Sequence, residues 1–256
     1  MMRYIMFLVL LMPTLSFSEE VSFEVDYDNG SIKNTLLLEN EKLFTVSASG
    51  IIDKIFIFSS NELAKEYLTT LDPSIKPRKK VKIGDVTLFI DSYKSISYFT
   101  GNPISGGVPS GSIGKVIAID GLQFKYARFG GYQKRAGIGG RLTQIGNTKI
   151  KYHIDSGATQ KGKHRGKIKS IGKSKFTYEI YTAWGNKAGY VGEITSIGAL
   201  KIKYYDTDYD KGFKGKLKSI GKVIFTYYPK TVRNTKANIV GKFKGQHGED
   251  RWVIIQ

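Results

Sequence analysis

Lysine is the residue type whose placement in this sequence most clearly suggests a binding chemistry. In the second half of the chain lysines alternate with apolar residues, which would place their ammonium groups on one face of a β-sheet. A broad positive face attracts polyanions such as phosphorylated lipid headgroups, acidic polysaccharides or nucleic acids. Lysine also keeps a flat repetitive sheet soluble and blocks edge pairing, so both interpretations stay open. The candidate binding lysines are Lys167, Lys169, Lys175, Lys201, Lys203, Lys216 and Lys218.

Aromatic rings form a second candidate site, because they can stack on sugars or bases. A tyrosine column recurs at positions 126, 152, 178, 204 and 227. Alternation places this column on the same face as isoleucine and phenylalanine, so we predict that it packs in the core. Aromatic residues nearer the loops are better placed to contact a ligand, and they are Tyr181, Trp184, Tyr190, Tyr205 and Tyr209.

Three aspartates form a weak candidate metal site. Asp206, Asp208 and Asp210 occupy positions 1, 3 and 5 of a calcium-loop pattern. The glycine falls at position 7 rather than 6, position 12 is Leu217 rather than glutamate, and no predicted helices flank the segment. The segment is therefore predicted to be a polar turn, and we expect no bound metal or cofactor.

Catalytic signals are weak in this chain. It has 0 cysteines, which excludes disulfides, zinc–cysteine sites, iron–sulfur clusters and a thiol nucleophile. The histidines His153, His164 and His247 have no metal-ligand spacing, and the chain has no nucleophile elbow, zinc-protease or phosphate-loop motif. These observations favour a protein that is not an enzyme, although a carboxylate pair built from distant residues would be compatible with the sequence.

The elements that would position these side chains come from a repeat in residues 114–256. Glycine recurs at 114, 140, 166, 192, 215 and 241, with spacings of 26, 26, 26, 23 and 26 residues. Apolar residues recur at fixed offsets after each glycine, and the tyrosine column follows. We predict that each unit forms two short strands around a glycine turn, followed by a polar loop. In outline the repeat resembles other short β-hairpin repeats that carry glycine and tyrosine, such as MORN repeats, with a different spacing and turn motif.

The expected fold is mainly β: a small α+β N-terminal domain followed by an antiparallel β-hairpin repeat sheet, a meander or solenoid of about five 26-residue units. The last copy is degenerate, and residues 252–255 are predicted to close the repeat as a cap.

The length of the turn decides which residues pair within a hairpin. A two-residue turn at Gly172-Lys173 would place Ile168 opposite Thr177 and mix apolar and polar residues on one face. A three-residue turn pairs Ile168 with Tyr178, so this register is predicted. It also places no lysine directly opposite another lysine. We therefore expect an outer face of lysine and threonine and an inner face of isoleucine, phenylalanine and tyrosine.

The N-terminal residues 1–18 are typical of a secretory signal peptide. Arg3 precedes an apolar run at residues 5–12, and small residues precede Glu19. The run is shorter than the roughly 20 residues of a membrane span.

We predict that residues 19–100 form the α+β domain, with one helix that begins at a capping box of Ser59 and Glu62. Residues 101–113 are rich in Gly, Pro and Ser and are predicted to be a linker.

Charge is divided unequally between the two halves. Residues 19–110 carry 10 Lys/Arg and 13 Asp/Glu, whereas residues 111–256 carry 29 Lys/Arg and 9 Asp/Glu.

Taken together, these features predict an exported, periplasmic or secreted, non-catalytic binding or scaffolding protein. Its basic repeat surface would contact an anionic envelope polymer or a protein partner, with peripheral envelope contact and no transmembrane helix after signal removal. Two alternatives stay open: a secreted hydrolase or toxin with the repeats as a targeting module, and a purely structural surface protein.

Overall fold

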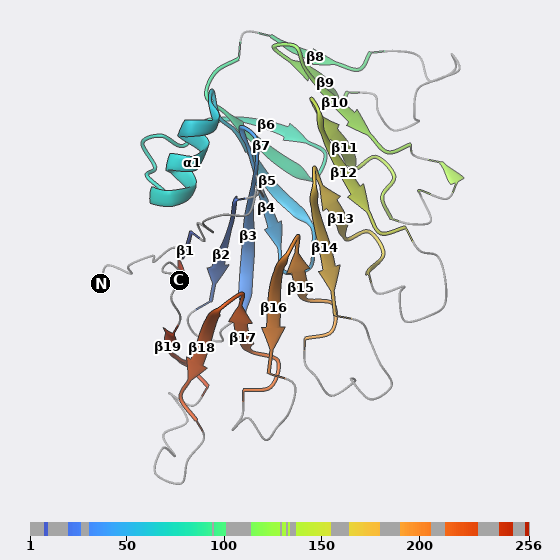
Figure 1. The fold of residues 1–256 in the computed structure, drawn as a ribbon. Coiled ribbons are helices and arrows are strands. Elements are labelled where there is room, and N and C mark those ends of the chain that lie inside the picture. The colour runs from blue at the N-terminus through green and yellow to red at the C-terminus, as the bar shows by residue number, and fades with distance from the viewer. Residues whose placement is uncertain are drawn as a thin grey trace.

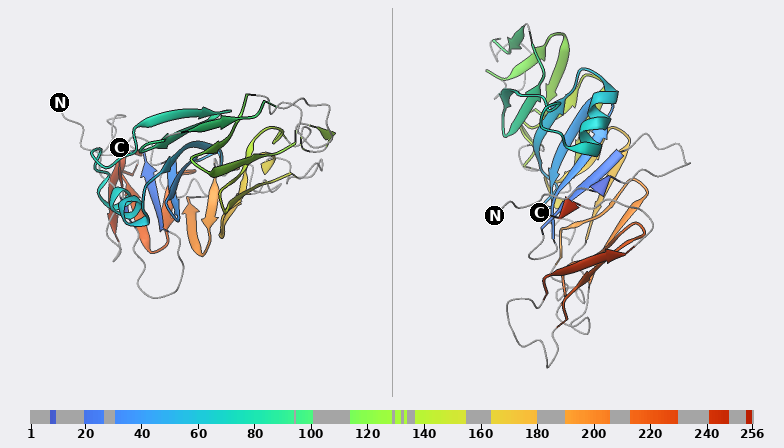
Figure 2. Two further views of the ribbon diagram at one scale, coloured as in Figure 1. Left: turned by 90° about the horizontal axis from the view of Figure 1, so that it is seen from above. Right: turned by 90° about the vertical axis from the view of Figure 1, so that its left-hand side faces the viewer.

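The computed structural model confirms a mainly β fold, in which two sheets face each other and one helix covers the outside of the first sheet (Figures 1 and 2). Most of the predicted signal peptide and the whole predicted linker at 101–113 lie outside the described residues, as do the candidate site residues Tyr181, Trp184, Asp206, Asp208, Tyr209 and Asp210. The described residues are 8–9, 20–26, 31–93, 95–100, 114–128, 130–131, 133, 137–154, 164–179, 190–205, 213–229, 241–247 and 254–255.

The first sheet has eight strands in the order β1-β2-β3-β4-β5-β7-β6, with β20 also paired to β2. Strands β2 to β5 form an antiparallel meander, and β7 lies parallel to β5 after a connection through the helix. The bounds are β1 Leu8–Val9, β2 Glu20–Val25, β3 Ile32–Glu39, β4 Lys42–Ser47, β5 Ile52–Ile57, β6 Lys79–Ile83, β7 Val86–Ile90 and β20 Ile254–Ile255. The predicted cap is thus wrong in its pairing, because β20 adds to the first sheet and not to the repeat.

Helix α1, Asn61–Thr70, begins one residue later than the predicted capping box requires. Its N-cap is Ser60, whose extended backbone lets Oγ accept a hydrogen bond from the Leu63 amide at 3.2 Å. The helix ends at Leu71, which adopts a left-handed conformation with φ of 50°. Its apolar face packs on the outer face of the first sheet, in a cluster that comprises Leu36, Leu38, Leu43, Phe56, Phe58, Ala64, Tyr67, Leu68 and Phe89.

The second sheet is an antiparallel meander of twelve strands in which every strand pairs with its neighbours in sequence. Strands β9 to β18 form five successive hairpins, and β8 and β19 are the two edges. The bounds are β8 Ile96–Tyr98, β9 Val116–Ile119, β10 Leu122–Tyr126, β11 Leu142–Ile145, β12 Thr148–Tyr152, β13 Ile168–Ile171, β14 Ser174–Tyr178, β15 Ile194–Ile197, β16 Leu200–Tyr204, β17 Leu217–Ile220, β18 Val223–Tyr227 and β19 Phe243–His247.

The predicted three-residue turn is wrong. Ile171 pairs with Ser174, so the turn holds two residues, and Gly172 occupies its first position with φ of 55°. This is the glycine placement that a type II′ turn requires. A β-bulge at Lys169 reconciles the short turn with the hydrophobic pattern, because Lys151 pairs with Ser170 while the next pair is Tyr152 with Ile168. The extra residue returns the strand to phase, so apolar side chains still share the inner face.

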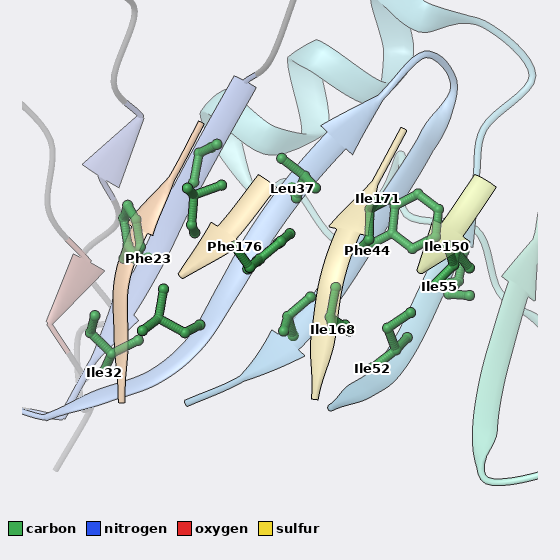
Figure 3. Close-up of a cluster of buried hydrophobic side chains, with 14 of the residues drawn as sticks. Phe23, Ile32, Leu37, Phe44, Ile52, Ile55, Ile150, Ile168, Ile171 and Phe176 are labelled. Carbon is green, nitrogen blue, oxygen red and sulfur yellow. The ribbon is translucent and has the colours of Figure 1, made fainter. Parts of the chain in front are cut away.

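The two inner faces bury a common core (Figure 3). One row of pairs crosses the first sheet and includes the buried residues Leu37, Phe44 and Ile55. Figure 3 shows Phe23, Ile32, Leu37, Phe44, Ile52 and Ile55 of the first sheet beside Ile150, Ile168, Ile171 and Phe176 of the second. A backbone hydrogen bond also joins the sheets, from the Ile168 amide to the Gly50 carbonyl at 2.9 Å. The expected inward placement of isoleucine, phenylalanine and tyrosine is therefore confirmed.

Candidate functional site

The outer face of the second sheet presents eight exposed lysines on strands β10 to β18. Each follows or precedes a buried apolar residue on the same strand, so the alternation of the strand directs its ammonium group away from the core. The outward positions of these strands contain no aspartate or glutamate in the part of the chain that the structure describes. The eight are Lys125, Lys149, Lys151, Lys169, Lys175, Lys201, Lys203 and Lys218.

Small polar residues separate these lysines across the strands. Gln144 on β11 pairs with Lys125 on one side and Lys149 on the other. Ser170 on β13 pairs with Lys151 and Lys175 in the same way. No two lysines are therefore directly opposite, which avoids the repulsion that adjacent like charges would cause. The predicted avoidance of lysine pairs holds, although the pairs themselves differ from those predicted.

The same arrangement continues toward β18. Ser196 pairs with Thr177 and with Lys201, and its hydroxyl lies 2.6 Å from that of Thr177. Ser219 pairs with Lys203 on one side and with the exposed Ile224 on the other. The lysine density thus falls at β18, where an apolar residue occupies the equivalent outward position.

Two of the candidate lysines do not lie on the open face. Lys167 and Lys216 each follow a repeat glycine and are half-buried, with Nζ 5.0 Å and 5.3 Å from the ring centroids of Tyr178 and Tyr227. Burial lowers the pKa of both ammonium groups. Lys167 also donates to the Gly192 carbonyl of the next hairpin. Their positions indicate a structural cation–π role at the edge of the core.

The equivalent basic residues of the first two hairpins make the same contacts. Lys115 donates to the Gly140 carbonyl at 2.6 Å, and its Nζ lies 4.9 Å from the Tyr126 ring centroid. Arg141 donates to the Gly166 carbonyl at 2.6 Å, in the same relation to the next unit. This basic column, one residue after five of the six repeat glycines, was not identified from the sequence; the exception is Gly192, which Glu193 follows. Its signal is present as Lys115, Arg141, Lys167, Lys216 and Lys242.

The tyrosine column is structural, as predicted. In each of five hairpins the tyrosine hydroxyl donates to the backbone carbonyl ten residues earlier; for example, Tyr178 donates to Ile168 at 2.7 Å and Tyr152 to Leu142 at 2.7 Å. Burial raises the pKa of these phenols and favours the neutral form, which can donate. The column therefore joins the two strands of each hairpin and leaves its rings unavailable for stacking on a ligand.

Two loop-proximal aromatic candidates are engaged in packing. Tyr205 is half-buried, donates to the Phe225 carbonyl at 3.1 Å, and lies under Lys218, whose Nζ is 5.2 Å from the ring centroid. Tyr190 stacks on Tyr204 with 4.9 Å between centroids. Trp184 and Tyr209 lie outside the described residues.

The histidines divide between an interior cluster and the surface. His153 and His164 contact each other and Tyr178, with ring centroids 5.4 Å to 5.9 Å apart, and His164 is buried. His247 is exposed on β19. No group of three His, Asp or Glu side chains suited to a metal ion occurs among the described residues, and the Asp206–Asp210 segment lies outside them.

A cavity of about 420 Å³ lies where the β6–β7 turn of the first sheet meets the first hairpins of the second. Its charged lining consists of Asp85, Lys115 and Arg141, with Tyr152 and several glycines. Lys115 and Arg141 already donate to carbonyls of neighbouring hairpins. The cavity holds one carboxylate and no histidine among its lining residues, so it does not present the paired groups that general acid–base catalysis requires.

Searches of protein-family models, curated proteins and solved structures found no match to this chain. The structure also contains, among its described residues, no helix with both the length and the apolar character needed to cross a bilayer. The lysine-rich outer face is therefore the best-developed candidate site, and Lys125, Lys149 and Lys151 join it although they were not among the candidates from sequence.

Proposed function

We propose that this chain is an exported, non-catalytic binding or scaffolding protein whose outer lysine face contacts an anionic polymer of the cell envelope. The observation that supports the proposal is the one-sided charge: eight exposed lysines and no carboxylate at the outward positions of β10 to β18, in the part of the chain described. A surface of one sign raises the local concentration of polyanions and accelerates their association.

Solubility alone does not require so much charge. A net charge of about 2 to 8 suffices for a small domain, whereas the chain has a formal net charge of +18. Ion pairs between described residues join Glu20 to Lys65, Glu41 to Lys42 and Asp53 to Lys54, all in the first half. The lysines of the outer face belong to none of these pairs, so they can neutralise an external anion.

The proposal includes a finer organisation of the chain. Residues 1–18 are a signal peptide that is removed on export, which implies a periplasmic or secreted location. Residues 19–100 are a small α+β domain, residues 101–113 a linker, and residues 114–256 a basic domain of about five 26-residue hairpin units. The common period, the shared turn glycines and the tyrosine column support the repeat, and the three-part N-terminus supports export.

Retention on immobilised heparin across a salt gradient tests this function. The chain from Glu19 onward should be retained at low salt and should elute as salt rises, because ions screen contacts between exposed charges. An uncharged polysaccharide on the same matrix is the control and should not retain it. Failure to bind heparin and isolated envelope fractions at low salt, or binding that salt does not weaken, would contradict the proposal.

A further inference from the structure

We infer that the outer face binds a linear acidic polysaccharide along one diagonal row of lysines, and not over its whole area; this inference rests on the proposed function. The row, called the lysine track below, is defined by the strand pairing of β10 to β16. Its members are Lys125, Lys149, Lys151, Lys175, Lys201 and Lys203.

The lysine track advances by two alternating steps. The first step crosses two strands at one register level, as from Lys125 through Gln144 to Lys149, and spans about 10 Å. The second step moves two residues along one strand, as from Lys149 to Lys151, and spans about 7 Å. The next crossing then leads from Lys151 through Ser170 to Lys175.

Each hairpin shifts the track by the same amount because each repeats the same turn and bulge. In the third crossing Thr177 stands where the earlier units have lysine, and the row continues through Ser196 to Lys201 and then to Lys203. The two steps combine to about 12 Å per hairpin, so the track from Lys125 to Lys203 is about 35 Å long. It ends where Ile224 replaces lysine on β18.

The twist of the sheet favours a flexible linear polymer over a flat surface. Neighbouring strands rotate by roughly 20° to 25°, which accumulates over the six steps from β10 to β16. The strands in Figure 1 change direction visibly between these two positions. A planar lipid surface would therefore meet only part of the track at once, whereas a flexible chain can follow the twist and contact successive lysines.

The side chains beside the track favour a polysaccharide over single-stranded nucleic acid. Proteins that bind single strands stack successive bases on aromatic rings. The described outward positions of β10 to β16 carry lysine, threonine, serine and glutamine and no aromatic residue. The tyrosines of these strands point inward and donate to backbone carbonyls. The track therefore offers charge without the stacking platform that bases require.

Two triple variants of equal charge separate the track from the general basicity of the chain. The track variant carries Lys149→Gln, Lys151→Gln and Lys175→Gln. The control variant carries Lys82→Gln, Lys222→Gln and Lys244→Gln, three exposed lysines that belong neither to the track nor to the eight lysines of the outer face. All six side chains are exposed, so both variants should retain the circular dichroism and unfolding midpoint of the parent chain.

Affinity for heparin oligosaccharides of graded length is the measurement. At low salt we expect the track variant to lose about 10- to 100-fold in affinity and about three units of slope in a plot of log K against log salt, and the control variant to change less than about 3-fold. The parent's affinity should rise with oligosaccharide length until the ligand spans about 35 Å and then level off.

The same titration distinguishes failure of the track from failure of the proposed function. Equal losses in the two triple variants would overturn the track while the binding function stands. Absence of heparin binding by the parent chain would remove the function and the track together. A preference for oligo-dT of the same charge, or for anionic phosphatidylglycerol vesicles, over heparin oligosaccharides would overturn the polysaccharide assignment.

Discussion

The buried tyrosine column makes a specific prediction for alkaline pH. Burial raises the pKa of Tyr152, Tyr178, Tyr204 and Tyr227, whereas a tyrosine in an unfolded chain ionises near pH 10. Above pH 10 the unfolded chain releases protons that the folded chain retains. The free energy of unfolding must therefore fall as the pH rises, because the folded state binds more protons.

The magnitude follows from the number of buried phenols. Each contributes a loss of about 1.4 kcal/mol one pH unit above its unfolded pKa. The four together lose about 5 to 6 kcal/mol at pH 11, which is comparable with the whole stability of a typical domain, about 5 to 15 kcal/mol. Tyr67 and half-buried Tyr126, whose pKa burial also raises, add to this loss. Half-buried Lys76, Lys115, Lys167 and Lys216 act in the opposite sense, because burial lowers their pKa, and they reduce the loss.

Phenolate absorbance and far-ultraviolet circular dichroism, followed together, measure this effect. We expect both signals to change in one steep transition near about pH 11, since the tyrosines ionise as the chain unfolds. Gradual ionisation centred on pH 10, with the strand signal retained, would show that the hydroxyls are accessible in the folded state and would refute the reasoning.

Tyr178→Phe supplies an internal control for the same experiment. It leaves the buried Ile168 carbonyl without its tyrosine donor, so the free energy of unfolding at pH 7 should fall by about 1 to 3 kcal/mol. It also removes one of the four titrating groups, so stability should decline less steeply with pH than in the parent. A variant that loses stability at pH 7 with an unchanged alkaline slope would contradict the assignment of the titration to the column.

Two further substitutions, each with a matched control, test the packing between hairpins and between sheets. Gly50→Ala places Cβ in steric conflict with the Tyr178 hydroxyl and ring, whereas Gly84→Ala meets nothing within 4 Å at a similar positive φ. Chemical denaturation should show a loss of about 1 to 3 kcal/mol more for the former, and equal losses would indicate backbone strain alone. Lys167→Gln removes a cation over the Tyr178 ring and should cost about 1 to 2 kcal/mol by thermal unfolding. Lys169→Gln, two residues away and exposed, should change stability by less than about 0.5 kcal/mol, and a similar loss in both would indicate a charge effect only.

The inner and outer faces of the second sheet could be predicted from the sequence because alternation within strands is local. The pairing register could not, since it depends on an irregularity that alternation does not mark. Gly172 begins a two-residue turn, and the bulge at Lys169 restores the phase that this short turn would otherwise disrupt. A period-2 argument assumes unbroken strands, and it therefore placed the extra residue in the turn instead of in the strand.

The sequence was sufficient to predict the type of candidate site, a positively charged sheet face, but not all of the residues that form it. Lysine alternation indicated a positive face, and Lys175, Lys201 and Lys203 lie on it. Lys167 and Lys216 were grouped with them by residue type alone, whereas their place after a turn glycine directs them over buried tyrosine rings. Side-chain direction at the junction of loop and strand depends on backbone conformation, which spacing does not encode.

The charge distribution between the two layers bears on how the molecule would meet a polyanion. A sheet built from hairpins has one apolar face that a single layer leaves exposed, and the first sheet buries that face against its own inner side chains. The first sheet in turn presents α1 to solvent, with Glu62 and Glu66 exposed on the helix and Asp72 just after it. Exposed basic residues accompany these carboxylates on the helix and just after it in the chain, among them Lys65, Arg78, Lys79 and Lys80, so this side carries charges of both signs. The two-layer arrangement thus supports the fold, because the first half covers the apolar face of the repeat sheet. It leaves the lysine face exposed to an anionic ligand, with no carboxylate at the described outward positions of β10 to β18.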